Sequence, residues 1–208
     1  MVRIKNRFAC DADGVLTDTG SAFAKILSKI NNRSVSQSEI TEYSMANLGL
    51  PDSELKNYLN NQFYMNLSPI KNSVKLINEL FQDNYIPIIT ARDQYDGVMQ
   101  DTETWFFDNG VLFDDLIQER DKSIPIKELG LDFIVEDCYE TCLDLAKKGI
   151  KTILFKQPWN KKYKLGTEED KGLIKSVEDW HEIHYTINNG IDKFSVSTQL
   201  TNPLTKNN

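Results

Sequence analysis

The stretch Phe8-Ala9-Cys10-Asp11-Ala12-Asp13-Gly14 joins a short apolar run directly to an acidic cluster. Short, nearly continuous apolar runs are typical of strands covered on both faces, and hence of a parallel sheet. A weaker run, 112–117, indicates one more strand. Three further apolar runs end in polar residues in the same way: 85–89 before Thr90-Ala91-Arg92, 131–135 before Glu136-Asp137, and 151–155 before Lys156-Gln157-Pro158.

Amphipathic segments alternate with these runs. Gly110 and Gly149 each follow such a segment directly, where glycine favours the end of a helix. The alternation predicts an α/β domain in which helices flank a parallel sheet, and we assign residues 1–17 and 69–186 to it. The segments with helical spacing of apolar residues are 69–82, 95–109 and 139–148.

Residues 18–68 do not follow this alternation. We expect them to form a small helical cap, inserted after the first strand and placed over the carboxyl edge of the sheet. The tail 187–208 is rich in Asn, Ser and Thr without a clear period, and we expect it to be irregular. The helices expected in the cap are 22–30, one from Ser36 with Glu39 as a capping box, and 51–61.

The composition excludes several classes of protein. The chain has 208 residues, with 24 Lys+Arg against 31 Asp+Glu, so its net charge is −7. A duplex-binding protein normally presents a basic face, and this acidic balance disfavours nucleic acid as a partner. No stretch reaches the roughly 18–20 consecutive apolar residues of a membrane span, so no membrane partner is expected. Three cysteines, an odd number, indicate reduced thiols and a cytoplasmic protein.

The polar clusters at the strand ends should form one site, because ligands of open α/β sheets bind outside the carboxyl ends of the strands. Several acids at one point repel one another and raise each other's pKa. A hard divalent cation with oxygen ligands relieves this repulsion, and Mg²⁺ suits a site with few carboxylates and a substrate phosphate. The residues expected at the site are Asp11, Asp13, Thr90, Arg92, Glu136 and Asp137.

These motifs resemble those of the haloacid-dehalogenase-like phosphatases, over about residues 7–157. Asp11-Ala12-Asp13-Gly14-Val15-Leu16-Thr17-Asp18 is similar to their first motif, and Thr90 to the second. Lys122 resembles the third motif and Glu136-Asp137 the acidic fourth. Within the superfamily, Ile88–Asp93, Arg120-Asp121-Lys122 and Ile153–Asn160 resemble the 5′(3′)-deoxyribonucleotidase group and its bacterial and phage relatives. The resemblance implies a Rossmann-like fold.

The resemblance also implies roles for the site residues. Asp11 would attack phosphorus and form an aspartyl-phosphate, and Asp13 would be the general acid and base. Lys122 would supply fixed positive charge, with the nearby Lys127 as a rival. Thr90 and the Ala91 amide would hold phosphate oxygens. The implied Mg²⁺ ligands are Asp11, the Asp13 backbone carbonyl, Asp137 and Glu136, with the order within the acidic pair left open.

Two further assignments stay open. For Arg92 there are three alternatives: it binds the phosphate, it contacts the base, or it points outward at the surface. The aromatic residues Tyr58, Phe63 and Tyr64 of the cap fit base stacking and core packing about equally.

The function expected from the sequence is Mg²⁺-dependent hydrolysis of a small phosphomonoester, most readily a (deoxy)nucleoside monophosphate, with the cap closing over the substrate. A polynucleotide 3′-phosphatase is an alternative, which the net charge disfavours. A catalytically silent binding module is another, which the complete set of motif residues disfavours. The sequence does not decide the base, the sugar, the phosphate position, or whether the protein forms a homodimer.

Overall fold

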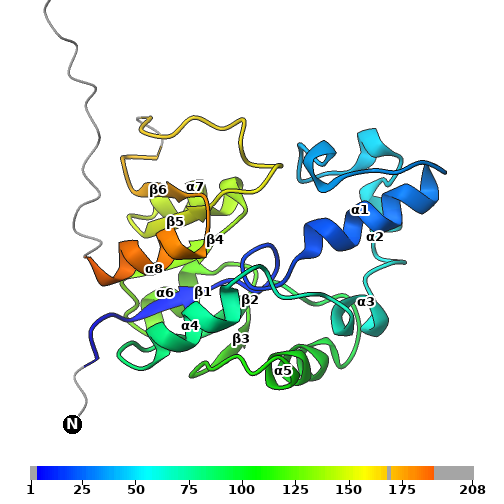
Figure 1. Ribbon diagram of the computed structural model, residues 1–208. Helices are drawn as coiled ribbons and strands as arrows, with labels where there is room; N and C mark the ends of the chain where they lie inside the picture. The colour runs from blue at the N-terminus through cyan, green and yellow to red at the C-terminus, as the bar shows by residue number, and fades with distance from the viewer. Residues whose placement is uncertain (1–3, 168–169, 190–208) are drawn as a thin grey trace, which may run out of the picture.

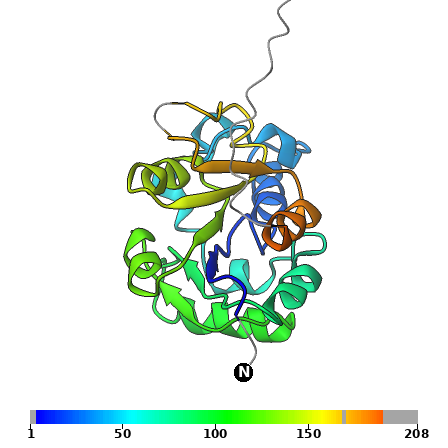
Figure 2. The ribbon, with the colours of Figure 1, turned by 90° about the vertical axis from the view of Figure 1, so that its left-hand side faces the viewer.

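The computed structural model describes residues 4–167 and 170–189. Its centre is one sheet of six strands in the order β3-β2-β1-β4-β5-β6 (Figures 1 and 2). All five strand pairings are parallel, as the apolar runs predict. The strands are β1 (Phe8–Cys10), β2 (Ile88–Thr90), β3 (Leu116–Gln118), β4 (Phe133–Glu136), β5 (Lys151–Phe155) and β6 (Ile174–Val177).

Alternate side chains of the sheet are buried on opposite faces. Phe8 and Cys10 of β1 belong to one apolar cluster, which includes α4 (Ser73–Phe81), α5 (Val98–Asp108) and α8 (Trp180–Asn188). The aromatic rings of Phe8 and Phe133 stack within this cluster, with centroids 4.8 Å apart. Burial of such a run on both faces explains why the strands lack polar alternation.

The opposite face of the sheet carries two helices, α6 (Ser123–Glu128) and α7 (Tyr139–Lys147). Ala9 of β1 belongs to the apolar cluster on this side, together with Ile126 of α6 and Leu145 of α7. Figure 2 shows the two layers of helices on either side of the strands. The protein is therefore a three-layer α/β domain, in agreement with the fold class predicted from the alternation.

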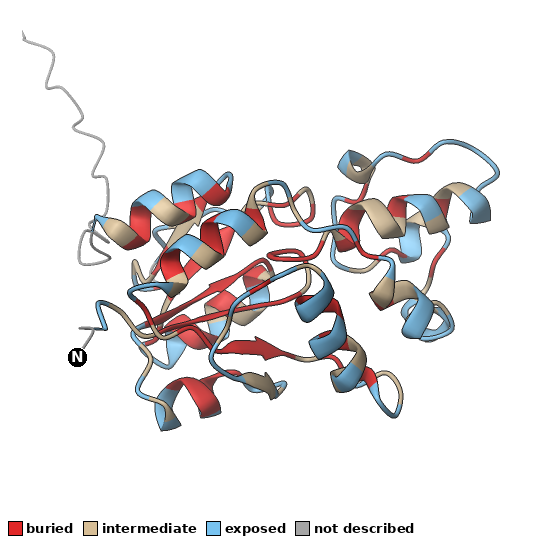
Figure 3. Cartoon of the chain, turned by 60° about the horizontal axis from the view of Figure 1, so that its bottom comes forward, coloured by how far each residue is buried: buried red, intermediate tan, exposed pale blue. Residues whose placement is uncertain are grey.

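The segment after β1 forms a group of short helices beyond the carboxyl edge of the sheet (Figures 1 and 3). The side chain of Asp18 accepts a hydrogen bond from the backbone N–H of Ser21 at 2.9 Å and so caps the first helix. The elements are α1 (Thr19–Ile30), the 3₁₀ turns η1 (Gln37–Glu39) and η2 (Ala46–Leu48), α2 (Asp52–Leu55) and α3 (Asn61–Met65). The buried residues that we call the cap cluster are Ala24, Leu27, Val35, Ile40, Met45, Leu50 and Trp159.

Several predicted elements differ in extent. The capping box at Ser36 starts only a single 3₁₀ turn, although its backbone N–H does donate to Glu39 Oε1 at 2.8 Å. The predicted helix 51–61 is shorter, since α2 ends at Leu55. A separate helix, α3, begins at Asn61, and its start is capped by Asn60, whose side chain accepts a hydrogen bond from the N–H of Phe63. Strand β2 begins only at Ile88, since Pro87 has no N–H for the ladder.

Strand β6 and helix α8 are absent from the predicted elements. The strand lies at the edge of the sheet and contains Lys175 and Ser176, which break the apolar run. Helix α8 extends to Asn188, so the first two residues of the predicted irregular tail are helical. The tail from 190 lies outside the described residues. Among the helices of the described part of the chain, none is long and apolar enough to cross a membrane.

Candidate active site

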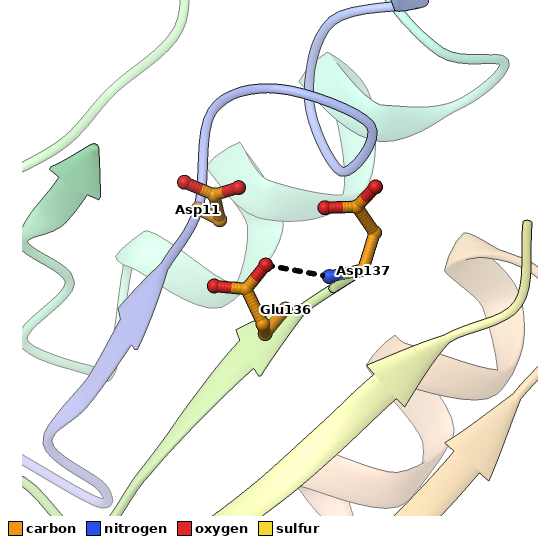
Figure 4. Close-up of side chains that lie close together, drawn as sticks. All are labelled: Asp11, Glu136 and Asp137. Atoms are coloured by element: carbon orange, nitrogen blue, oxygen red, sulfur yellow. Dashed lines mark hydrogen bonds between the residues drawn. The ribbon is translucent and has the colours of Figure 1, made fainter. Parts of the chain in front are cut away.

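The carboxyl ends of β1 and β4 bring three buried acids together (Figure 4). Asp11 follows β1 directly, and its backbone N–H donates to the carbonyl of Val135 in β4 at 2.9 Å. Glu136 ends β4 and Asp137 follows it. One carboxylate oxygen from each of Asp11, Glu136 and Asp137 lies within 4.8 Å of the others. We call this group the carboxylate cluster.

Lys122 is the cation beside this cluster. Its Nζ lies 2.6 Å from Asp11 Oδ1 and 2.6 Å from Glu136 Oε2, and its side chain is 5% exposed. Burial alone would lower the pKa of Lys122, but Asp11 and Glu136 raise it, so the ammonium stays charged. The rival Lys127 is exposed and lies in α6.

One ammonium does not balance three carboxylates. Burial and the charge of Glu136 raise the pKa of Asp11 to about 7, against the lowering effect of Lys122. Burial and the charges of Glu136 and Asp11 also hold the pKa of Asp137 well above its usual range. The cluster therefore carries more negative charge than its surroundings stabilise.

The two acids at the end of β4, Glu136 and Asp137, differ in how their oxygens are engaged. Glu136 Oε2 binds Lys122, and its Oε1 accepts the backbone N–H groups of Asp137 and Cys138, at 3.0 Å each. Asp137 Oδ2 accepts the indole N–H of Trp159 at 2.9 Å. Glycine is required at position 14, where φ is +71° and a Cβ would lie 2.2 Å from Asp137 Oδ2.

Asp13 has a separate cation, Arg92. The guanidinium donates from Nε to Asp13 Oδ2 at 2.8 Å and from Nη2 to Oδ1 at 2.7 Å. Its Nη1 donates to Thr102 Oγ1 at 3.0 Å, and the ring of Tyr64 lies 4.3 Å from its Cζ. Burial would raise the pKa of Asp13, but the Arg92 charge and hydrogen bonds lower it overall.

The burial of Arg92 excludes one of the three roles considered for it. The side chain is 1% exposed, so the outward surface role is wrong. A guanidinium is rarely buried without a paired anion, and Asp13 is that anion. Thr90 ends β2 and is buried, and its Oγ1 accepts the backbone N–H of Arg92 at 3.4 Å.

A cavity of about 350 Å³ lies between the cap and the sheet edge. Asp13, Ala91 and Asp137 from the sheet edge line it. Phe63 and Tyr64 also line it, whereas Tyr58 packs against the cap cluster. The other lining residues are Thr19, Phe23, Ile40, Glu42, Tyr43, Met45, Leu55, Leu59, Gln94, Arg120 and Trp159.

The family model described as 5′ nucleotidase, deoxy (pyrimidine), cytosolic type C protein matches residues 6–187. The chain belongs to this family. It is accordingly a phosphoric monoester hydrolase of the haloacid-dehalogenase-like type, and its substrate is a small phosphomonoester. A nucleotidase of Clostridium acetobutylicum is 25% identical over 158 residues, which are 73% of this chain and 81% of the relative.

Solved structures confirm the fold. A haloacid-dehalogenase-superfamily hydrolase of Geobacter sulfurreducens has a TM-score of 0.56 at 12% identity, covering 89% of this chain and 97% of its own. The hydrolase YfnB of Bacillus subtilis, solved with bound magnesium, has a TM-score of 0.52 at 14% identity. The match covers 89% of this chain and 100% of YfnB.

The site has a donor set that fits Mg²⁺. The carboxylates of Asp11 and Asp137 are hard oxygen ligands, and both are buried in a group with excess negative charge. A divalent cation there would remove the repulsion that raises the pKa of both acids.

Three residues that contact the site are not among the site residues expected from the sequence. Trp159 and Asn160 both bind Asp137, and the Gln157 side chain donates to the carbonyl of Gly14 at 2.8 Å. A signal for them existed, since these residues directly follow the apolar run 151–155. That run ends at the same edge of the sheet as the other three, so its polar cluster belongs to the same site.

Proposed function

We propose that the protein hydrolyses (deoxy)nucleoside 5′-monophosphates with Mg²⁺, through an aspartyl-phosphate on Asp11. The observation that carries this proposal is the buried carboxylate of Asp11, 2.6 Å from Lys122 and in one cluster with Asp137. Such an arrangement supports phosphoryl transfer, which needs a positioned nucleophile and positive charge near the transferring group.

In the first step Asp11 attacks phosphorus and the ester P–O bond breaks. Lys122 holds Asp11 Oδ1, which leaves the other oxygen of the carboxylate for the new bond. The leaving oxygen takes a proton from Asp13. In the second step Asp13 accepts a proton from water as the water attacks phosphorus, and Asp11 is released with inorganic phosphate.

Arg92 sets the state of Asp13 in this scheme. Because Arg92 keeps the pKa of Asp13 low, Asp13 is held in its base form in this structure. To donate a proton, the Asp13 carboxyl must turn away from Arg92 toward the cavity that it lines. We therefore assign Arg92 to holding Asp13 in the base form that accepts the proton of water in the second step, rather than to the phosphate, since its three nitrogens bind Asp13 and Thr102 in this structure.

Asp11, Asp137 and the backbone carbonyl of Asp13 are the proposed Mg²⁺ ligands. Bound Mg²⁺ supplies positive charge against the transferring phosphoryl group. Glu136 is assigned to Lys122 and to the backbone instead, because both of its oxygens already accept hydrogen bonds. Thr90 and the Ala91 amide stay as proposed phosphate ligands at the end of β2.

The cavity supports a nucleotide as the phosphomonoester. It is large enough for a small organic group, and Phe63 presents an aromatic ring on which a base can stack. Tyr64 is buried, with its ring against the Arg92 guanidinium, which fits the core-packing alternative. The match to a deoxynucleotidase family supports the same substrate. The three free cysteines and the family description support a cytoplasmic location.

A substrate panel tests the proposal. Deoxynucleoside 5′-monophosphates should release phosphate with Mg²⁺ and should not do so with excess EDTA. A 3′-phosphorylated oligonucleotide of equal phosphate concentration should be a poor substrate. Efficient cleavage of the oligonucleotide would favour a polynucleotide phosphatase, and turnover that is unchanged by EDTA would reject the metal.

A matched pair of variants tests the choice between the two acids. Asp137→Asn should abolish binding of Mg²⁺ in a calorimetric titration, because it removes a ligand charge. Glu136→Gln should weaken binding less, since its oxygens contact Lys122 and the backbone. The reverse order would move the ligand to Glu136.

A further inference from the structure

Trp159 connects the cap to the carboxylate cluster. It lies in the loop after β5, and its side chain is 7% exposed. All the other buried members of the cap cluster come from residues 24–50, so in the described part of the chain Trp159 is the one buried member that the cap itself does not supply. The ring therefore packs against the cap.

The same side chain holds Asp137. The indole N–H donates to Asp137 Oδ2 at 2.9 Å, and the neighbouring Asn160 donates to the backbone carbonyl of Asp137 at 2.8 Å. Gly14 crowds Oδ2 so closely that even a Cβ at that position would lie 2.2 Å away. The carboxylate is thus held between Gly14 and the indole, which fixes its rotamer and directs its second oxygen.

We propose that Trp159 is a positioning residue that fixes Asp137 for Mg²⁺ and makes the affinity for Mg²⁺ depend on the packing of the cap. The inference rests on the proposed function, in which Asp137 is a metal ligand. A neutral indole has one donor and cannot compete for the metal, so it orients the carboxylate without neutralising it. Hydrogen bonds of this kind to a metal ligand typically change affinity or activity by 10–100-fold.

Trp159→Phe tests the hydrogen bond, because phenylalanine keeps an aromatic ring in the cap cluster and lacks the N–H. In a calorimetric titration of the substrate-free protein, its Kd for Mg²⁺ should rise by roughly tenfold or more. The loss of turnover should shrink as Mg²⁺ is raised, because excess metal compensates for the misplaced ligand. A defect in folding alone would not respond to Mg²⁺.

Trp105→Phe is the matched control. Trp105 is also buried, and its indole N–H donates to a backbone carbonyl, that of Leu67, at 2.9 Å. The same substitution there removes a buried N–H of the same kind without touching a carboxylate, so its Kd for Mg²⁺ should stay within twofold of the wild type. A Kd for Trp159→Phe no larger than that of Trp105→Phe would overturn the proposal.

A second pair tests the dependence on the cap. Leu27→Ala loosens the cap cluster, whereas Leu145→Ala makes the same truncation in the cluster beneath α7. We expect Leu27→Ala to bind Mg²⁺ severalfold more weakly than the wild type and Leu145→Ala to bind it with unchanged affinity. Both variants are measured well below their melting temperatures. Equal affinities would overturn the role of the cap.

Asp137→Asn distinguishes a failure of the metal assignment of Asp137 from a failure of the role of Trp159. If Asp137→Asn abolishes Mg²⁺ binding while Trp159→Phe leaves it unchanged, the proposed function stands and the role of Trp159 is overturned. If Asp137→Asn binds Mg²⁺ as tightly as the wild type, the metal assignment fails and the role of Trp159 fails with it.

Discussion

Asp11 and Asp13 lie two residues apart in one loop, but their surroundings differ in charge balance. Lys122 is shared between Asp11 and Glu136, and the pKa of Asp11 is raised to about 7. Arg92 pairs with one carboxylate, that of Asp13, through two nitrogens, and the pKa of Asp13 is lowered. The Lys122 side of the site thus lacks positive charge that a metal can supply, whereas the Arg92 side is already balanced.

The largest expected effect concerns the Lys122 side. Asp11→Asn should reduce turnover by roughly 10⁴-fold or more, because it removes the nucleophile and keeps the size of the side chain. Steady-state phosphate release measures the loss, and circular dichroism should show an unchanged fold. Near-normal turnover in this variant would contradict the role of Asp11.

Lys122→Met should reduce kcat by about 10²–10³-fold, since it removes a fixed charge beside the reacting group. It should also lower the free energy of unfolding by roughly 3–5 kcal/mol, because two buried carboxylates lose their cation. Urea denaturation at pH 7 measures the second effect. If Lys127→Met gives the same losses, Lys122 is not the cation that matters.

Arg92→Lys tests the balanced side. It keeps the charge but loses the fork of two donors, so Asp13 should be held less well and kcat should fall by roughly tenfold. Arg33→Lys is the control, because Arg33 pairs with Glu39 on the exposed surface of the cap. A kcat for Arg92→Lys equal to that of the control would show that Asp13 needs no positioning.

The smallest effect concerns Asp121, the neighbour of Lys122 on the surface. Hydrogen bonds from Lys148 and Ser123 lower the pKa of Asp121 to about 2. A lowered folded-state pKa stabilises the protein above about pH 4, and the contribution is lost as the pH falls toward 2. Lys148→Ala should therefore cost at most about 0.5 kcal/mol at pH 7, and less at pH 2, where Asp121 is about half protonated, in urea denaturation. A larger cost at pH 2 than at pH 7 would contradict the assignment.

The sequence predicts the strands best where burial on both faces leaves a clear run. Strands β1 and β5 lie at the predicted residues, and the three acids of the carboxylate cluster meet as expected from their strand ends. Edge strand β6 is missed because the half-buried Lys175 and Ser176 break its apolar run. The roles of the site residues stay predictions.

The partners of the site residues are the part that the sequence does not reveal. Arg92 and Asp13 are 79 positions apart, and their contact depends on how two side chains turn at the sheet edge. The sequence indicates only that Trp159 is an aromatic residue in a loop. Its place after the apolar run 151–155 puts it at the site, but its hydrogen bond to Asp137 depends on how the side chain turns there.

The central place of β1 has a consequence for the order of events during synthesis. The strand that precedes Asp11 is made first, yet it pairs with β2 and β4, and the contact of Arg7 with Asp132 spans 125 positions. At about 5–20 residues per second, a ribosome needs roughly 6–25 s to add that length. The nascent chain therefore carries its nucleophile unassembled until β4 has emerged, and a fragment that ends before residue 133 has no β4 against which to place Asp11.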